Sequence, residues 1–126
     1  MSTPVGPYSP VVRAGDWVIL SGQLGLADGA LVEGGVDAQT RQIFANASAL
    51  LAKAGASLAQ VAKCTVFMAD MADFPTMNAA YVASIEAAAP GHRPTRSTVG
   101  NVTMALGAVV EIEFWAFVGV GGVSVP

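Results

Sequence analysis

The chain has 126 residues, which is the length of one domain of ordinary size. Hydrophobic residues make up 53% of the chain and charged residues 12%, which is more apolar material than a small monomer needs to bury. We therefore expect part of it to close a subunit interface. The six lysines and arginines are scattered along a chain of net charge −3, which argues against a nucleic-acid partner, because tracking phosphates needs a basic stripe.

Membrane insertion and secretion are also not expected. The longest runs without charge, residues 97–110 and 114–126, are too short and too rich in glycine to span a bilayer. The first residues, MSTPVGPYSP, have neither the basic nor the apolar region of a signal peptide. We expect a cytoplasmic protein without a membrane partner.

The first half of the chain predicts a strand, a helix and a second strand. Residues 16–22 form a strand after the proline-rich start, and turn residues follow at 25–29. Asp37 suits a helix cap, and apolar residues recur at helical spacing until Gly55. Alternation then returns in residues 61–68, with Cys64, Val66 and Met68 on one face and Lys63, Thr65 and Phe67 on the other. The single cysteine, Cys64, is therefore interpreted as a buried small hydrophobe, and no disulfide can form within the chain.

The second half predicts another helix and two strands. The helix begins near Asp73, tolerates Pro75 in its first turn and ends at Pro90-Gly91. Its predicted buried stripe is Phe74, Met77, Tyr81, Ile85 and Ala88. Strands at 95–102 and 108–118 follow, and the short turn between them favours antiparallel pairing. This order predicts one α+β domain, with two helices covering one face of a mixed sheet and a partner subunit covering the other.

Several kinds of catalytic site are absent from the sequence. The only histidine, His92, lies in a loop, so a Ser-His-Asp or Cys-His arrangement would have to include it. No cluster of histidine, cysteine and carboxylates has metal-ligand spacing. The phosphate-binding glycine motifs G-x-G-x-x-G and G-x-x-x-x-G-K do not occur either. We expect no metal and no cofactor.

The charged residues near the C-terminal strands are the candidates for chemistry. Strand periodicity places Glu111 and Glu113 on one face of an otherwise apolar run, where carboxylates need solvent, a partner or a hydrogen bond. If the two strands pair, Arg96 lies within a few residues of these glutamates. The residues alone leave two interpretations open. One is a cross-strand ion pair, and the other is a pocket where Arg96 holds a substrate carboxylate while a glutamate handles a water molecule.

A succession of short segments carries a family resemblance. In chain order they are Gly6-Pro7-Tyr8-Ser9, Ser21-Gly22-Gln23, Gln39-Thr40-Arg41-Gln42, Ala54-Gly55-Ala56-Ser57-Leu58, Lys63-Cys64-Thr65-Val66-Phe67-Met68, Asp73-Phe74-Pro75-Thr76-Met77-Asn78, Pro94-Thr95-Arg96-Ser97 and Val110-Glu111-Ile112-Glu113. This succession resembles the RidA family, also called the YjgF family, over about residues 5–118. The resemblance implies a chorismate-mutase-like α+β fold over a single domain, residues 1–126, and a homotrimer with sites in the clefts between subunits.

The resemblance also implies an activity and roles for individual residues. Archetypal members of the family hydrolyse reactive 2-imino acids, or their enamine tautomers, to 2-keto acids and ammonia without a cofactor. Arg96 matches the arginine that binds the substrate carboxylate, and Glu111 matches the glutamate that orients water. The matching pocket positions are Tyr8, Ser21, Gly22, Asn78 and Thr98. Without the resemblance, Tyr8 reads equally as a packing anchor, Asn78 as an exposed helix residue, and Ser21 and Gly22 as the turn that ends a strand.

The sequence departs from the family pattern in places that bear on the substrate. Thr98 stands where many members have cysteine, Leu106-Gly107 replaces a common Leu-Pro, and residues 119–126 form a glycine-rich tail beyond the match. Two alternatives stay open: a family member that acts on another enamine, such as aminoacrylate or 2-aminomuconate, and a trimeric module that binds small carboxylates or hydrophobic partners without catalysis. Ribonuclease activity is not expected, because no acid/base pair accompanies a phosphate-binding surface.

Overall fold

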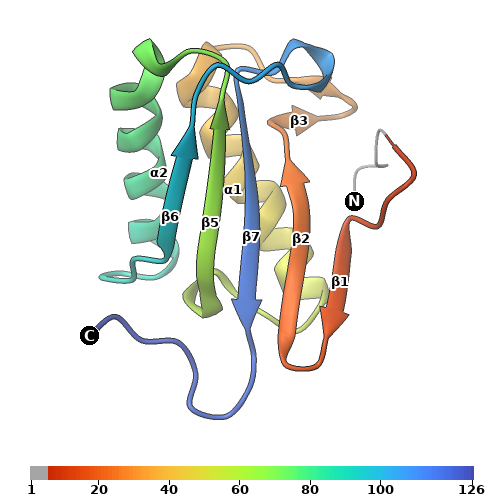
Figure 1. The fold of residues 1–126 in the computed structure, drawn as a ribbon, viewed down its shortest axis with the longest axis vertical. Coiled ribbons are helices and arrows are strands. Elements are labelled where there is room, and N and C mark those ends of the chain that lie inside the picture. The colour runs from red at the N-terminus through yellow and green to blue at the C-terminus, as the bar shows by residue number, and fades with distance from the viewer. Residues whose placement is uncertain (1–5) are drawn as a thin grey trace.

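A computed structural model, which describes residues 6–126, has one five-stranded mixed sheet with two helices packed on one of its faces (Figure 1). The sheet strands are β1 (Val11–Ala14), β2 (Trp17–Gln23), β5 (Val61–Met68), β6 (Thr95–Val99) and β7 (Val110–Phe117). A small hairpin contains β3 (Leu26–Ala27) and β4 (Ala30–Leu31), and the helices are α1 (Gly35–Lys53) and α2 (Phe74–Ala88). Short 3₁₀ turns are η1 (Leu58–Gln60), η2 (Met71–Asp73) and η3 (Ala105–Gly107). The predicted α+β class, with both helices on one face, is confirmed.

The order of the strands in the sheet is β1-β2-β7-β5-β6, and it corrects one prediction. β6 pairs in parallel with β5, whereas β7 pairs antiparallel with both β5 and β2. The predicted antiparallel pairing of the last two strands is therefore wrong, because β5 lies between them. The connection at residues 100–109 crosses the end of β5, where the Val102 N–H donates to the Met68 carbonyl and the Ala69 N–H donates to the Val109 carbonyl.

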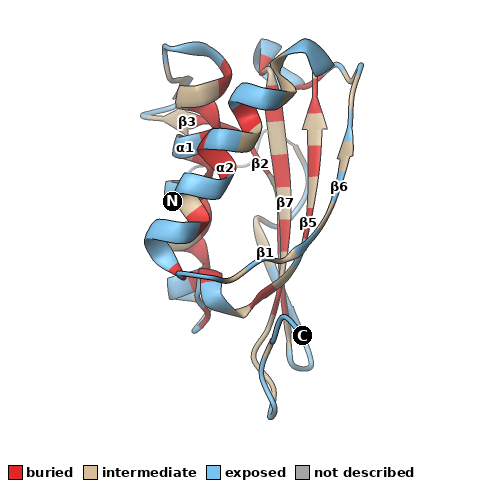
Figure 2. Ribbon diagram, turned by 90° about the vertical axis from the view of Figure 1, so that its left-hand side faces the viewer, coloured by how far each residue is buried: buried red, intermediate tan, exposed pale blue. Residues whose placement is uncertain are grey.

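The core lies between the helices and one face of the sheet, and it follows the predicted alternation (Figure 2). Cys64, Val66 and Met68 are fully buried, as are Ile112 and Phe114 on β7. The residues that meet them include Ile43, Ala47, Leu50 and Leu51 on α1 and Met77, Tyr81 and Ile85 on α2. Cys64 is a core residue as predicted, and burial raises the pKa of its thiol to about 11. The thiol therefore stays protonated at neutral pH and is a poor nucleophile.

Several details of the elements differ from the predictions, and the strands predicted at 95–102 and 108–118 are shorter than expected. Helix α1 begins two residues before Asp37, after a Gly34 cap whose φ of 116° suits glycine. Asp37 instead lies in the first turn, where it pairs with Arg41. Ala88, assigned to the buried stripe of α2, is exposed at the end of that helix. β1 was not predicted, because its short run follows a proline-rich segment that gives little strand signal.

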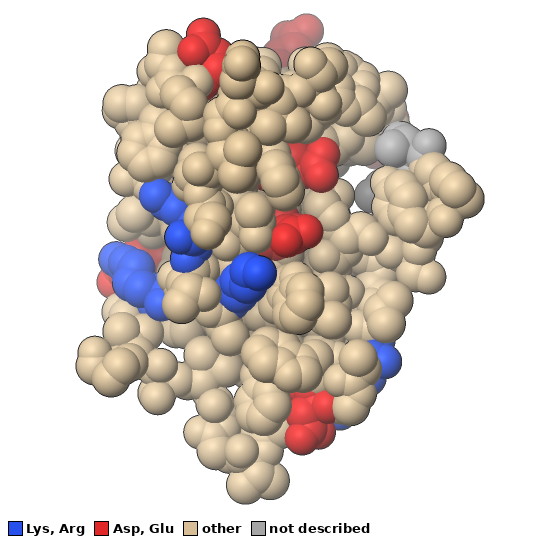
Figure 3. Space-filling model, in the orientation of Figure 1, with Lys and Arg blue, Asp and Glu red and all other residues tan. Residues whose placement is uncertain are grey.

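The second face of the sheet is covered by neither helix, although it carries large apolar side chains. Trp17 on β2 lies edge-on to Trp115 and Phe117 of β7, with ring centroids 6.0 and 5.2 Å apart. The Lys63 ammonium lies over the Trp115 ring at 5.2 Å. Figure 3 shows acidic side chains toward the middle of this face and cationic side chains nearer the β6 edge. We refer to this surface of the sheet as the open face.

Neither helix of the part described, residues 6–126, has the combination of length and apolar character needed to cross a membrane. Within the same residues, no three histidine, cysteine or acidic side chains lie close enough together to hold a metal ion.

Candidate active site

The predicted site residues fall into two groups on opposite faces of the sheet. Arg96, Asn78 and Thr98 lie on the helix side, at the edge formed by β6 and α2. Ser21, Gly22 and Glu111 lie in or beside the open face, around β2 and β7, and Tyr8 belongs to the segment that Ser21 attaches to β2. One chain does not bring the two groups together.

Arg96 is half-buried and is held by neutral partners. Its Nη1 donates to Asn78 Oδ1 at 2.6 Å, and its guanidinium carbon lies 4.8 Å from the ring centroid of Tyr81 and 5.5 Å from that of Phe74. The ion pairs found among residues 6–126 are Arg41–Asp37 and Arg93–Glu86, so no described carboxylate neutralises Arg96. Its positive charge is therefore free to attract an anion at the edge of the sheet.

Thr98 follows Arg96 on the same face of β6. In the parallel register Arg96 pairs with Cys64 and Thr98 pairs with Val66, and both partners point into the core. Thr98 is half-buried, whereas Ser97 between them is exposed. The strand thus presents Arg96 and Thr98 side by side toward α2.

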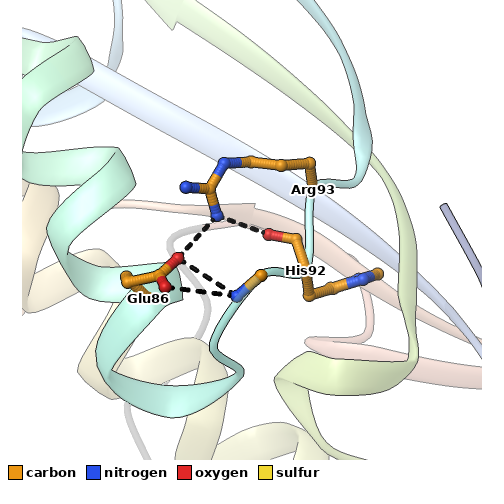
Figure 4. A network of polar contacts seen from close by, with 4 residues as sticks. Glu86, His92 and Arg93 are labelled. Atoms are coloured by element: carbon orange, nitrogen blue, oxygen red, sulfur yellow. Dashed lines mark hydrogen bonds and ion pairs between the residues drawn. The ribbon is translucent and has the colours of Figure 1, made fainter.

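The connection between α2 and β6 is fixed by a network that precedes Arg96 (Figure 4). Glu86 accepts a hydrogen bond from Arg93 Nη1 at 2.9 Å and another from the Gly91 N–H at 3.2 Å, and these contacts, with Arg93 first, lower the pKa of Glu86. Arg93 also donates to the His92 carbonyl, and His92 Nε2 lies 2.6 Å from the Val61 carbonyl at the start of β5. His92, the only histidine of the chain, therefore ties the segment before β6 to β5. This contact gives it a structural role.

Ser21 ties the N-terminal segment to the sheet. Its hydroxyl donates to the Ser9 carbonyl at 2.6 Å, and its backbone N–H donates to the Pro10 carbonyl at 3.0 Å. Tyr8 precedes this attachment and is 46% exposed. Tyr8 is thus an exposed side chain on the segment that Ser21 attaches to β2.

Gly22 provides the space that the Glu111 carboxylate occupies. The register between β2 and β7 shifts after Leu20, which is the mark of a β-bulge at Ser21 and Gly22. A Cβ on Gly22 would overlap Oε2 of Glu111 and lie 2.8 Å from its Cδ. The glycine is therefore required by close approach rather than by backbone conformation.

The environment of Glu111 favours a proton acceptor. The side chain is half-buried, and burial raises the pKa of this carboxyl, with the nearby Glu113 adding to the effect. A glutamate with a raised pKa binds a proton more readily near neutral pH than an ordinary one does. This arrangement can orient a water molecule and accept its proton.

Arg96 and Glu111 of one chain do not face the same space. β5 separates their strands, whose axes are about 10 Å apart across two strand spacings. Arg96 is in line with Phe114 of β7, so Glu111 is also displaced by three residues along the strand. Arg96 contacts α2, whereas Glu111 alternates with the buried Val110 and Ile112 and points away from the helices. The cross-strand ion pair considered from the sequence does not occur in this structure.

Comparisons with known proteins place the chain in a family. The family model described as Endoribonuclease L-PSP matches residues 1–118. This chain belongs to the Endoribonuclease L-PSP family, also known as the YjgF/RidA family. The resemblance stated from the sequence is therefore confirmed.

Relatives within the L-PSP family carry several names. The chain is 39% identical over 111 residues to Reactive Intermediate Deaminase A, chloroplastic, of Arabidopsis thaliana, covering 86% of this chain and 57% of that protein. It is 37% identical over 111 residues to the 2-iminobutanoate/2-iminopropanoate deaminase of Mus musculus, covering 86% of this chain and 79% of the relative. It spans 66% of the length of the mitochondrial protein mmf1 of Schizosaccharomyces pombe.

Solved L-PSP family structures share the fold. RidA from an Antarctic Psychrobacter is 37% identical, with a TM-score of 0.84 and 91% of each chain covered. Escherichia coli TdcF, solved with bound serine, is 32% identical, with a TM-score of 0.84 and 90% of each chain covered. The arrangement of two helices on a mixed sheet is therefore the fold of this family.

Two residues of the L-PSP chain that contact Arg96 were assigned from the sequence only to the buried stripe of a helix. Phe74 and Tyr81 both place their rings within cation–π distance of the guanidinium, and Asn78 lies between them along α2. Their spacing relative to Asn78 places all three on one helix face, which is a signal that the sequence contains. The signal was not sufficient, because the sequence did not place Arg96 against that helix.

Proposed function

We propose that this chain hydrolyses small 2-imino acids and their enamine tautomers, such as 2-iminobutanoate and 2-iminopropanoate, to 2-keto acids and ammonia. The observation that carries the proposal is the state of Arg96, a fixed guanidinium with neutral partners and no carboxylate neighbour among residues 6–126. Such a group binds a carboxylate bidentately. The names of the mouse and Arabidopsis relatives support deamination as the reaction.

We further propose that each active site is shared between two protomers of a homotrimer. A ligand that meets both Arg96 and Glu111 requires two chains, because the two side chains leave opposite faces of one sheet. Arg96, Asn78 and Thr98 of one protomer would then face Tyr8, Ser21, Gly22 and Glu111 of its neighbour. The uncovered aromatic surface of the open face supports such an assembly, as does the separation of cationic and acidic side chains across it.

The reaction follows from these positions. Arg96 holds the substrate carboxylate, which places the protonated C=N carbon beside a water molecule held by Glu111. Glu111 takes a proton as the water oxygen bonds to that carbon, and it returns this proton to the nitrogen of the resulting carbinolamine. The C–N bond then breaks, the hydroxyl proton leaves with ammonia as ammonium, and the 2-keto acid remains. No thiol is needed, in agreement with the buried and protonated Cys64.

The direct test generates 2-iminobutanoate in situ from threonine with a pyridoxal-phosphate-dependent dehydratase and follows the disappearance of the imine. We expect this protein to accelerate the loss of the imine when present at a small fraction of the imine concentration. No acceleration at equimolar protein would contradict the proposal and favour the carboxylate-binding module, for which the serine bound to TdcF is a precedent. A panel that includes aminoacrylate and 2-aminomuconate decides among enamine substrates. The cytoplasmic location stays a prediction.

Replacing Gly22 by alanine should slow the reaction without unfolding the protein. The new Cβ would displace the Glu111 carboxylate, and a shift of about 1 Å in a catalytic group costs roughly 10- to 100-fold in rate. Steady-state kinetics measure the effect, and the double variant with Glu111→Ala is the control. Gly22→Ala should have no further effect once Glu111 is gone, so additive losses would show that the glycine acts elsewhere.

A further inference from the structure

One face of helix α2 surrounds the guanidinium of Arg96. Phe74, Asn78 and Tyr81 follow each other at spacings of four and three residues, which aligns them along that face. The guanidinium carbon lies 4.8 Å from the centroid of the Tyr81 ring and 5.5 Å from that of the Phe74 ring, and Asn78 accepts its hydrogen bond at 2.6 Å. Both distances are within the range of cation–π contacts.

We propose that Tyr81 and Phe74 are positioning residues that hold the Arg96 guanidinium ready for a carboxylate ligand. An arginine side chain has many rotamers, so a ligand that binds it normally has to fix it and loses the corresponding entropy. If the rings already fix the side chain before the ligand arrives, ligand binding no longer carries that cost. A carboxylate partner would also fix the arginine, but it would neutralise the charge and compete with the ligand. Aromatic faces attract the cation and leave its positive charge intact.

The ring of Tyr81 carries this role, and its hydroxyl does not. Tyr81 is 4% exposed, and its ring packs edge-on against Phe44 with centroids 5.3 Å apart. Its hydroxyl is buried and has no hydrogen-bond partner within residues 6–126. Burial also raises the pKa of Tyr81, so the phenol stays protonated and cannot serve as a base. The immobile ring is therefore a fixed platform for the mobile arginine.

The contribution of these rings to turnover rests on the proposed function, but their effect on Arg96 does not. The first measurement therefore uses ligand-free protein labelled with ¹⁵N and records the arginine Nε–Hε signals, of which the chain has few: Arg13, Arg41, Arg93 and Arg96. Arg96→Lys assigns the signal. In the wild type we expect it to be shifted by the ring currents and to exchange slowly with water.

Variants of Tyr81 and its neighbours distinguish the effect of the aromatic ring on the Arg96 signal from the effects of the hydroxyl and of core packing. Tyr81→Leu should lose the shifted Arg96 signal, whereas Tyr81→Phe should keep it. Phe44→Leu is the matched control, because Phe44 packs against Tyr81 in the core, while the rings that lie over the guanidinium among residues 6–126 are those of Tyr81 and Phe74. The signal should therefore persist. Phe74→Leu, at a half-buried position, tests the second ring even if Tyr81→Leu does not fold.

The second measurement is the affinity for 2-oxobutanoate, the stable 2-keto acid that hydrolysis of 2-iminobutanoate would release. Loss of one cation–π contact predicts affinity weaker by about 5- to 30-fold in Tyr81→Leu, with the wild-type value restored in Tyr81→Phe. In turnover the loss should raise KM more than it lowers kcat, and Tyr81→Leu should have no effect in an Arg96→Lys background.

An unchanged Arg96 signal in both Tyr81→Leu and Phe74→Leu would overturn the inference, as would equal effects of Phe44→Leu and Tyr81→Leu. A wild-type protein that shows no imine hydrolysis would refute the proposed function, and the nitrogen spectra would still decide whether the rings hold Arg96.

Discussion

Replacing Arg96 by alanine should reduce imine hydrolysis by at least about 100-fold, because two charge-assisted hydrogen bonds to the substrate carboxylate, each worth about 1.5–3 kcal/mol, are lost together. The expected change is mainly in kcat/KM, since the arginine binds the carboxylate both before and during the reaction. The measurement is the assay with 2-iminobutanoate generated in situ, carried out with the purified variant.

The fold should tolerate this substitution. Arg96 is half-buried at a sheet edge, makes one side-chain hydrogen bond and takes part in no ion pair among residues 6–126. Light scattering and thermal unfolding should therefore show an intact oligomer. Arg41→Ala is the matched control, because Arg41 is an exposed arginine of α1 whose pairing with Asp37 lies within its own helix. Turnover retained by an intact Arg96→Ala oligomer would refute the assigned role.

Mixing two inactive variants should restore activity if each site draws on two chains. Glu111→Gln keeps the shape of the side chain beside Gly22 but removes the proton acceptor, and a general base contributes roughly 10²- to 10⁴-fold. Arg96→Ala keeps Glu111, and Glu111→Gln keeps Arg96. In mixed trimers, some sites join an intact Arg96 from one variant to an intact Glu111 from the other.

The expected recovery can be counted from the symmetry. When the two variants are mixed in equal amounts, unfolded and reassembled together, about one quarter of the sites in a cyclic trimer receive both intact residues. The measurement is the specific activity of the mixture against each variant reassembled alone. No recovery, with exchange of subunits confirmed by mass spectrometry of the assembled protein, would place the complete site within one chain.

The pH profile tests Glu111 independently. Burial, with a smaller effect of Glu113, raises the pKa of Glu111, and a general base acts only when it is deprotonated. The rate should therefore fall as the pH decreases, with a midpoint above the ordinary value for glutamate. This acid limb of kcat/KM should be missing from the residual activity of Glu111→Gln.

The sequence predicted which face of the sheet each side chain occupies better than it predicted which strands pair. Alternation placed the buried side chains of residues 62–68 and 110–117 correctly, because burial repeats every second residue whatever strand lies alongside. Val61 is buried against this alternation, at a register shift between Val61 and Lys63. Periodicity carries no information about which edges pair. The parallel β5–β6 pairing depends on contacts such as Val102–Met68 and on the attachment of His92 to Val61, which join residues far apart in the chain.

The same limit applies to the site. The short segments that carry the resemblance named Arg96, Glu111 and the pocket residues, but the assumed hairpin brought arginine and glutamate together within one chain. The insertion of β5 separates them and puts Arg96 against α2. The roles of Phe74 and Tyr81 then depend on a contact between a helix and a strand that no local pattern shows.

The placement of Arg96 and Glu111 on opposite faces has a consequence for how such an enzyme is regulated. If both are required, a freshly made or diluted subunit is catalytically silent, although it has every reactive group. Turnover then begins only when chains meet, so the abundance of the protein acts as a threshold for clearing its substrate.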